Sequence, residues 1–149
     1  MVEFALVIPV FLLIVIAILD VGRGVFAYNS ITNGAREGAR LAIVNQTSTS
    51  IISRAVNQVA VAETDVPNVT VAFKESAPNA NYANNPTCAP LKIGCVAIVT
   101  FQTTFKPLTP VVAQILFSNG VTLTATSVEA IEYVCPNPTV AAGSCPKQP

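Results

Sequence analysis

The sequence predicts an α+β protein in which a long N-terminal α-helix carries a small antiparallel β-sheet head with short helices. Three observations lead to this class. The apolar residues are concentrated near the N-terminus, in residues 4–19. Segments rich in Val, Ile, Thr and Phe follow in the second half of the chain, as expected for strands. Four cysteines lie beside these strands or in a Pro-rich tail, which favours two disulfides.

The amino-acid composition limits the classes of function that this protein can have. The 149 residues leave room for one domain, or for one small domain plus a long helix. Hydrophobic residues make up 52% and charged residues only 11%, against roughly 25% charged in an average globular protein. Eight basic and eight acidic residues cancel, which argues against a nucleic-acid partner. The absence of histidine excludes imidazole-based catalysis and His-ligated metals. We therefore expect a structural or membrane-linked protein, with no enzymatic activity, cofactor or metal.

The N-terminal helix begins with residues 4–19, an uncharged run between Glu3 and Asp20. At 1.5 Å per residue this run spans roughly 24 Å, slightly less than a bilayer core of about 30 Å. Extending the span over residues 21–28 reaches further but must carry Asp20 and Arg23, which are three residues apart and can form an ion pair on one helix face. A signal peptide would have basic residues before the run, whereas Glu3 is acidic. Pro9 is expected to kink the helix.

Helical spacing persists from residue 21 to residue 44, with a stripe of mostly small side chains. Small residues at this spacing allow another helix to approach closely, but the stripe could equally pack on the chain's own head. We place the helix in residues 1–45 and the head in residues 46–149, and expect part of the helix to project. The stripe consists of Gly24, Ala27, Ile31, Gly34, Ala35, Gly38 and Ala42.

The head is predicted as a half-buried antiparallel sheet of residues 69–73, 96–105 and 121–133. In the last strand, one face is mostly apolar and the other mostly polar. The apolar face contains Val121, Leu123, Ala125, Ile131 and Tyr133, interrupted by Ser127 and Glu129.

Two short helices and two irregular segments complete the predicted head. Ser50 can cap a helix over residues 51–62. Thr109 can cap another helix, over residues 110–117, in which Pro110 takes the first position. Residues 77–90 and the tail from Cys135 are rich in proline and are expected to be irregular.

The four cysteines allow three disulfide connectivities, between which the sequence does not choose. Local pairs are the simplest scheme, and free buried thiols are the alternative. Disulfides would indicate an oxidising, extracytoplasmic location. The local pairs are Cys88–Cys95 and Cys135–Cys145.

Other candidate sites carry weaker signals. Asn45 and Asn68 begin the triplets Asn-Gln-Thr and Asn-Val-Thr, which match the N-glycosylation pattern. The acidic pairs Glu63/Asp65 and Glu129/Glu132 are more typical of solvated surface than of a metal or acid–base site. No catalytic constellation is found in the sequence. Glu3 does require an explanation, because a carboxylate beside an apolar run is costly unless it is paired.

The first 45 residues closely resemble the N-terminus of TadE/TadG-like proteins, pilin-like components of bacterial tight-adherence systems. The resemblance is carried by VEFALVIPVF at 2–11, the Asp20-x-x-Arg23 step and AREGAR at 35–40. Beyond them, the Pro-Leu-Thr-Pro segment at 107–110 between strands is also TadE-like.

The resemblance implies a life cycle and a role for one carboxylate. Family members are inserted in the cytoplasmic membrane as precursors and cut after a glycine by a prepilin peptidase. An acidic residue near the mature N-terminus then neutralises the N-terminal amine of a neighbour during assembly. Carried over, this residue is Glu3, which here is third in the sequence with no leader or glycine before it.

We therefore interpret the chain as a structural subunit that polymerises through its N-terminal helix into an extracellular filament for surface attachment. Its expected partners are copies of itself, the prepilin peptidase, the pilus assembly machinery and, before assembly, the membrane. One alternative is a minor pseudopilin that supports assembly of another pilin, and a second is a membrane-anchored binding domain that never assembles. The candidate subunit contacts are Glu3, Phe4, Pro9, Phe11, Asp20, Arg23, Gly24, Gly34 and Gly38.

Overall fold

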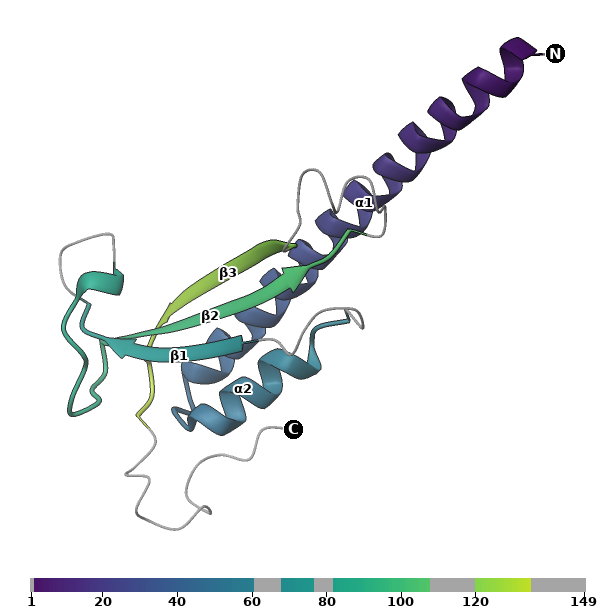
Figure 1. The fold of residues 1–149 in the computed structure, drawn as a ribbon. Helices are drawn as coiled ribbons and strands as arrows, with labels where there is room; N and C mark the ends of the chain where they lie inside the picture. Colours follow the sequence, from purple (N-terminus) through teal and green to yellow (C-terminus); the bar gives the residue numbers. More distant parts are fainter. Residues whose placement is uncertain (1, 61–67, 77–81, 108–119, 135–149) are drawn as a thin grey trace.

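A computed structural model describes residues 2–60, 68–76, 82–107 and 120–134 of the chain. In this part of the chain the elements follow the order α1, α2, β1, η1, β2, β3 (Figure 1). The long helix α1 begins at the N-terminal end of the chain, and its first half extends well beyond the head (Figure 1). The fold is α+β, as predicted from the sequence.

Helix α1 spans Val2–Ala42 and is 41 residues long, or roughly 62 Å at 1.5 Å per residue. It continues without interruption through Pro9, and the ribbon shows no sharp bend there (Figure 1). The expected kink is therefore not seen. Pro9 still removes one backbone hydrogen bond of the helix, and the residues next to it are exposed.

Helix α2 spans Ser48–Asn57, so it begins earlier than predicted. Its N-cap is Thr47, which makes no side-chain capping hydrogen bond, and the predicted cap Ser50 lies inside the first turn. The Asn45 side chain explains the early start, because its Oδ1 accepts a hydrogen bond from the Thr47 backbone N–H at 2.9 Å. This local turn orders the chain before Ser48 and lets the helix begin there.

The described strands form a three-stranded antiparallel sheet in the order β1-β2-β3. Strand β1 spans Asn68–Lys74, β2 spans Val96–Phe105 and β3 spans Val121–Ala130. All three predicted strands are confirmed, but the last ends three residues early. After Ile131 the chain turns toward α1, and the Tyr133 backbone N–H donates to the Ile43 carbonyl at 3.2 Å. Tyr133 is therefore largely exposed rather than buried on the sheet.

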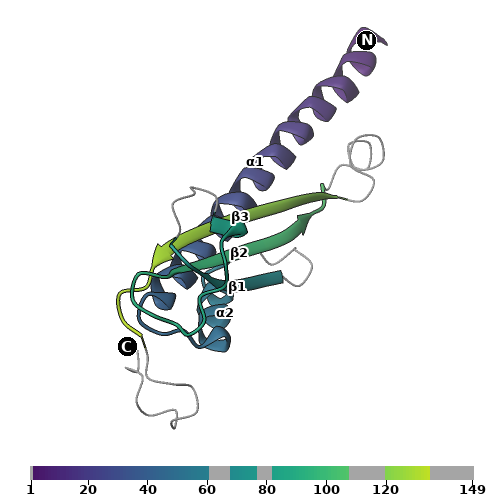
Figure 2. The same ribbon diagram turned by 90° about the vertical axis from the view of Figure 1, so that its left-hand side faces the viewer.

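The core lies between the sheet and the two helices, which cover the same face (Figures 1 and 2). Ala97, Val99 and Phe101 of β2 are completely buried on this face. Ile31 and Ala35 of α1 pack in the same cluster. The second half of α1 is thus part of the head's core, while the first half projects from it.

The connection from β1 to β2 contains the short 3-10 helix η1 (Tyr82–Asn84) and a disulfide between Cys88 and Cys95. This pair is the local one predicted from the sequence. The other predicted pair, Cys135–Cys145, lies outside the described residues. So do the acidic pair Glu63/Asp65, the helix expected over residues 110–117 and the Pro-rich tail.

Candidate subunit-contact surface

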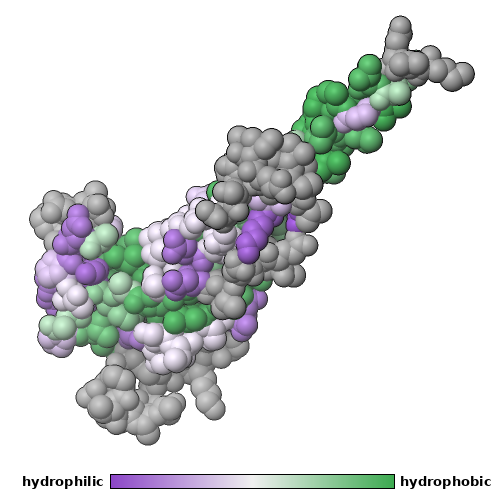
Figure 3. All heavy atoms as spheres, in the orientation of Figure 1, coloured by the Kyte–Doolittle hydropathy of each residue, from purple (hydrophilic) through white to green (hydrophobic). Residues whose placement is uncertain are grey.

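Most apolar side chains of the projecting half of α1 are exposed. Phe4, Phe11 and the large aliphatic residues between them are exposed. Figure 3 shows this rod as hydrophobic over most of its described surface. Within the described residues, α1 from Phe4 to Ala42 is the one helix long and apolar enough to cross a membrane. The length and hydropathy of the rod are compatible with anchoring in a membrane.

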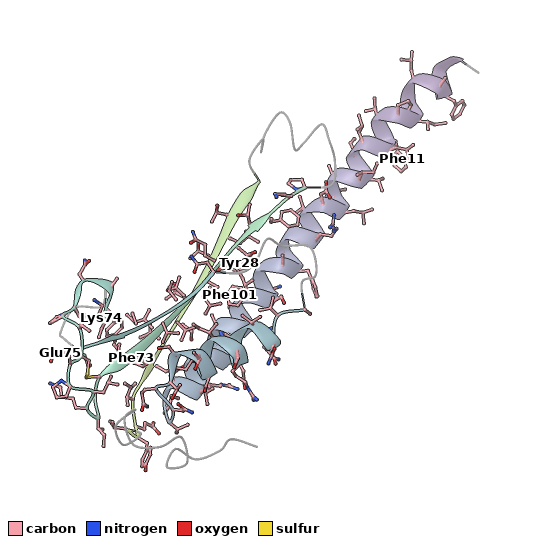
Figure 4. The ribbon with its side chains drawn as sticks, turned by 60° about the horizontal axis from the view of Figure 1, so that its bottom comes forward. Phe11, Tyr28, Phe73, Lys74, Glu75 and Phe101 are labelled. Atoms are coloured by element: carbon pink, nitrogen blue, oxygen red, sulfur yellow. A yellow bond between two sulfur atoms is a disulfide. The ribbon has the colours of Figure 1, made fainter. Side chains whose placement is uncertain are left out.

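Four of the predicted contact residues lie on this rod. Phe4 and Phe11 point away from the helix axis into open surroundings, and Figure 4 shows Phe11 far from the head. Pro9 lies on the same exposed segment. Glu3 is in the first turn of α1, and its side chain is outside the described part of the chain.

Asp20 and Arg23 form the ion pair that their spacing predicts. Their carboxylate Oδ1 and guanidinium Nη1 are 3.5 Å apart. Asp20 is only 6% exposed, in contrast to the exposed residues that precede it. The pair therefore marks the level at which α1 meets the head, and burial of its carboxylate is compensated by a nearby cation.

The small residues of α1 contact the chain's own head. Gly24 lies against the ring of Phe105, where a β-carbon would be 3.5 Å from Cε1. At Gly34 and Gly38, helix α2 approaches so closely that a β-carbon would be 2.8 Å from the Ala55 carbonyl oxygen or 3.0 Å from the Ala55 β-carbon. The intramolecular alternative therefore holds for Gly34 and Gly38, and neither belongs to an exposed subunit surface.

Glu37 connects α1 to α2 through an ion pair that the sequence analysis did not predict. Its Oε1 accepts hydrogen bonds from Nη2 and Nε of Arg54 at 2.7 and 3.1 Å. The pair that helix spacing does indicate, Glu37 with Arg40, is longer at 3.8 Å. The sequence could not predict the shorter contact, because Arg54 is 17 residues from Glu37 and lies on a different helix.

The remaining candidates are surface features. Asn68 is exposed at the start of β1, whereas Asn45 is partly buried and its side-chain oxygen is engaged by Thr47. Glu129 and Glu132 are both exposed. Among the described residues, no group of three or more His, Cys, Asp or Glu side chains could hold a metal ion.

The sequence analysis considered residues 21–28 only as an extension of the apolar span, and the structure shows an exposed apolar set within them. Val21, Val25, Phe26 and Tyr28 lie beyond the 4–19 run, beside the head, and are largely exposed although apolar or aromatic. Figure 4 shows Tyr28 close to the head. The signal was present in the sequence: these positions are apolar, yet they alternate with the small residues that face the head.

Comparison with known proteins relates the N-terminal helix to a described family. Residues 1–40 match the family model described as TadE-like protein. The match covers nearly all of α1 and ends before α2. Neither a curated protein nor a solved structure gives a significant match to the chain.

Proposed function

Because residues 1–40 match the family model of TadE-like proteins, we propose that this chain is a pilin-like component of the tight-adherence pilus machinery and a structural filament subunit. It polymerises through its N-terminal helix into an extracellular filament that serves surface attachment. Its function is structural and requires no catalytic step or cofactor. The observation that carries this proposal is the contrast between a head with its own core and a projecting rod that is apolar on all sides.

Burial of the rod supplies the driving force for assembly. Sixteen residues separate Glu3 from Asp20, and transfer of a large apolar side chain from water is worth roughly 1.5 kcal/mol or more. Transfer from a bilayer yields much less, because lipid tails are as apolar as the side chains. Close packing between helices and a specific polar contact must therefore select the filament over the membrane.

Glu3 provides that polar contact in the proposed assembly. Before assembly the chain lies in the cytoplasmic membrane, where a prepilin peptidase processes it. The new α-amino group of one subunit then pairs with the Glu3 carboxylate of a neighbour. In a medium without water, an unpaired carboxylate is strongly unfavourable, so the pairing fixes how adjacent subunits are positioned.

Substitution of Glu3 tests the proposal. We expect Glu3→Gln and Glu3→Ala chains to insert in the membrane at the wild-type level but to give no filaments in material sheared from cells. Glu132→Gln is the matched control, because it removes an exposed carboxylate of the head. Filaments of normal abundance from the Glu3 variants would contradict the role of this carboxylate.

A second candidate is a minor pseudopilin that remains anchored and supports assembly of another pilin. It is favoured by the family match itself, which is to TadE-like proteins and is confined to residues 1–40. The two candidates differ in stoichiometry. A filament subunit makes up most of the protein in purified filaments, whereas a pseudopilin is found there in traces.

A further inference from the structure

Two groups of charged side chains on the head lack a close ion pair among the described residues. Arg36, Glu129 and Glu132 lie more than 4 Å from every oppositely charged group in this part of the chain. Arg40 meets Glu37 only at 3.8 Å, and this carboxylate is engaged more closely by helix α2. We call Arg36 and Arg40 the basic pair, and Glu129 and Glu132 the acidic pair.

The basic pair lies on the side of α1 that faces away from the core of the head. Arg36 and Arg40 are one helical turn apart and exposed, whereas Ala35 and Ala39 next to them are almost completely buried. The Arg40 side chain is 75% exposed. In a filament with the N-terminal helices at its centre, this side of α1 faces neighbouring subunits. Guanidinium groups that lose water at such a contact need carboxylates as partners.

The acidic pair lies at a similar distance along the axis of α1, but at an edge of the sheet. Strand β3 is an edge strand of the three-stranded sheet. The backbone N–H of Tyr133 donates to the Ile43 carbonyl, so the chain after β3 lies beside the end of α1. The acidic pair is close to Tyr133 in sequence, and the basic pair precedes Ile43 by roughly 5 and 10 Å of helix. The two pairs thus occupy different sides of the head at similar heights.

We propose that the basic pair of one copy of this chain binds the acidic pair of a second copy beside it in the filament. The two pairs have opposite charge and similar heights, so a copy that is rotated about the filament axis and shifted a short distance along it brings them together. The contact joins two different surfaces and can therefore repeat from copy to copy, as a helical filament requires. Exposed ion pairs contribute little affinity each, but they fix the orientation of adjacent heads and disfavour other arrangements. This inference rests on the proposed function and concerns contacts between heads.

Charge reversal in the full chain tests the contact. We expect Arg36→Glu combined with Arg40→Glu to lower filament yield by roughly tenfold or more, because like charges then face each other. Glu129→Arg combined with Glu132→Arg should have the same effect for the same reason. A chain with all four substitutions restores opposite charges, and its yield should return to within about threefold of wild type.

Two controls accompany the reversals. Lys74→Glu combined with Lys92→Glu changes the net charge as much as reversal of the basic pair, but on β1 and the β1–β2 connection, and should give normal filaments. Neutralising one carboxylate, as in Glu132→Gln, leaves Glu129 in place and should also give normal filaments. Membrane insertion and circular dichroism of each variant show whether its head is folded.

A zero-length cross-link identifies the partner of the basic pair. In filaments of the Arg36→Lys variant, a carbodiimide joins the new amine to a carboxylate in contact with it. An amide bond forms, and the carbodiimide takes up the water that is lost and becomes a urea. We expect covalent dimers in which position 36 of one copy is joined to Glu129 or Glu132 of the second copy. Links only within one chain, or only to a different protein, would overturn the inference.

The outcomes separate this inference from the proposed function. Normal filaments from both reversed pairs would refute the contact and leave the proposed function intact. A loss of filaments that the fourfold variant does not restore would also refute it, because each pair would then contact other groups. If the wild-type chain itself forms no filaments, the proposed function fails and this inference fails with it.

Discussion

A β-carbon on Gly34 of α1 would lie 2.8 Å from the carbonyl oxygen of Ala55 in α2. The Val59 Cγ2 atom would be as close, 2.7 Å from the same β-carbon. The Ala55 carbonyl oxygen belongs to the main chain, so it cannot rotate away to accept a larger residue. Small residues that resemble an intermolecular helix contact are here what holds α2 against α1.

Gly34→Ala is predicted to destabilise the head by about 1–3 kcal/mol, because the added methyl group overpacks the α1–α2 contact. Thermal unfolding of the full chain in detergent, followed by circular dichroism, measures the change. Gly22→Ala is the matched control, since nothing lies within 4 Å of a β-carbon there. The control should be neutral or more stable by up to about 1 kcal/mol, from helix propensity. Equal effects of both substitutions would contradict the predicted close contact.

Phe101→Ala is predicted to cost about 3–5 kcal/mol, because this ring is completely buried between the sheet and α1. A loss of this size is a large part of the stability of a typical domain. Gln102→Ala, next to it but exposed, should change the free energy of unfolding by less than about 0.5 kcal/mol. Chemical denaturation of the two variants compares them directly, and similar midpoints would show that the ring is not in the core.

Replacing Cys88 and Cys95 by alanine is predicted to lower the free energy of unfolding by about 2–3 kcal/mol. The unfolded chain regains the conformational entropy that the disulfide removes by closing this short loop. The measurement is the unfolding midpoint with and without reductant. Non-reducing peptide mapping of the same variant tests the second predicted pair. We expect one remaining disulfide, between Cys135 and Cys145, and a variant with two free thiols there would contradict that pairing.

Arg54→Gln is predicted to cost less than about 1 kcal/mol, although it removes the closest ion pair between α1 and α2. Arg54 is largely exposed, and water and salt screen the attraction to Glu37. Unfolding at low and high salt should give a smaller difference between wild type and variant at high salt. An effect as large as that of Gly34→Ala would mean that charge, rather than backbone proximity, holds the two helices together.

Local patterns predicted most of the elements. The Val- and Thr-rich segments became strands, and β2 has the predicted limits. The Asp20–Arg23 pair and the Cys88–Cys95 disulfide follow from short separations along the chain. Each of these features depends on residues that are close in sequence.

Tertiary contacts account for the features that were not predicted. The stripe of small residues fits a foreign helix and the chain's own α2 equally well, and only packing distinguishes the two for Gly34 and Gly38. The end of β3 depends on the hydrogen bond from Tyr133 to Ile43, 90 residues earlier in the chain. That Val21, Val25 and Tyr28 are exposed follows from which side of α1 faces the head, and only the folded structure shows that side.

Electron microscopy of material sheared from the producing cells, combined with mass spectrometry of its contents, tests the central claim most directly. The account predicts thin filaments composed chiefly of this chain, absent from cells that express the Glu3→Ala variant. Filaments with only traces of the chain would favour the pseudopilin role. Cells that contain abundant protein but no filaments would contradict the account and leave a membrane-anchored domain.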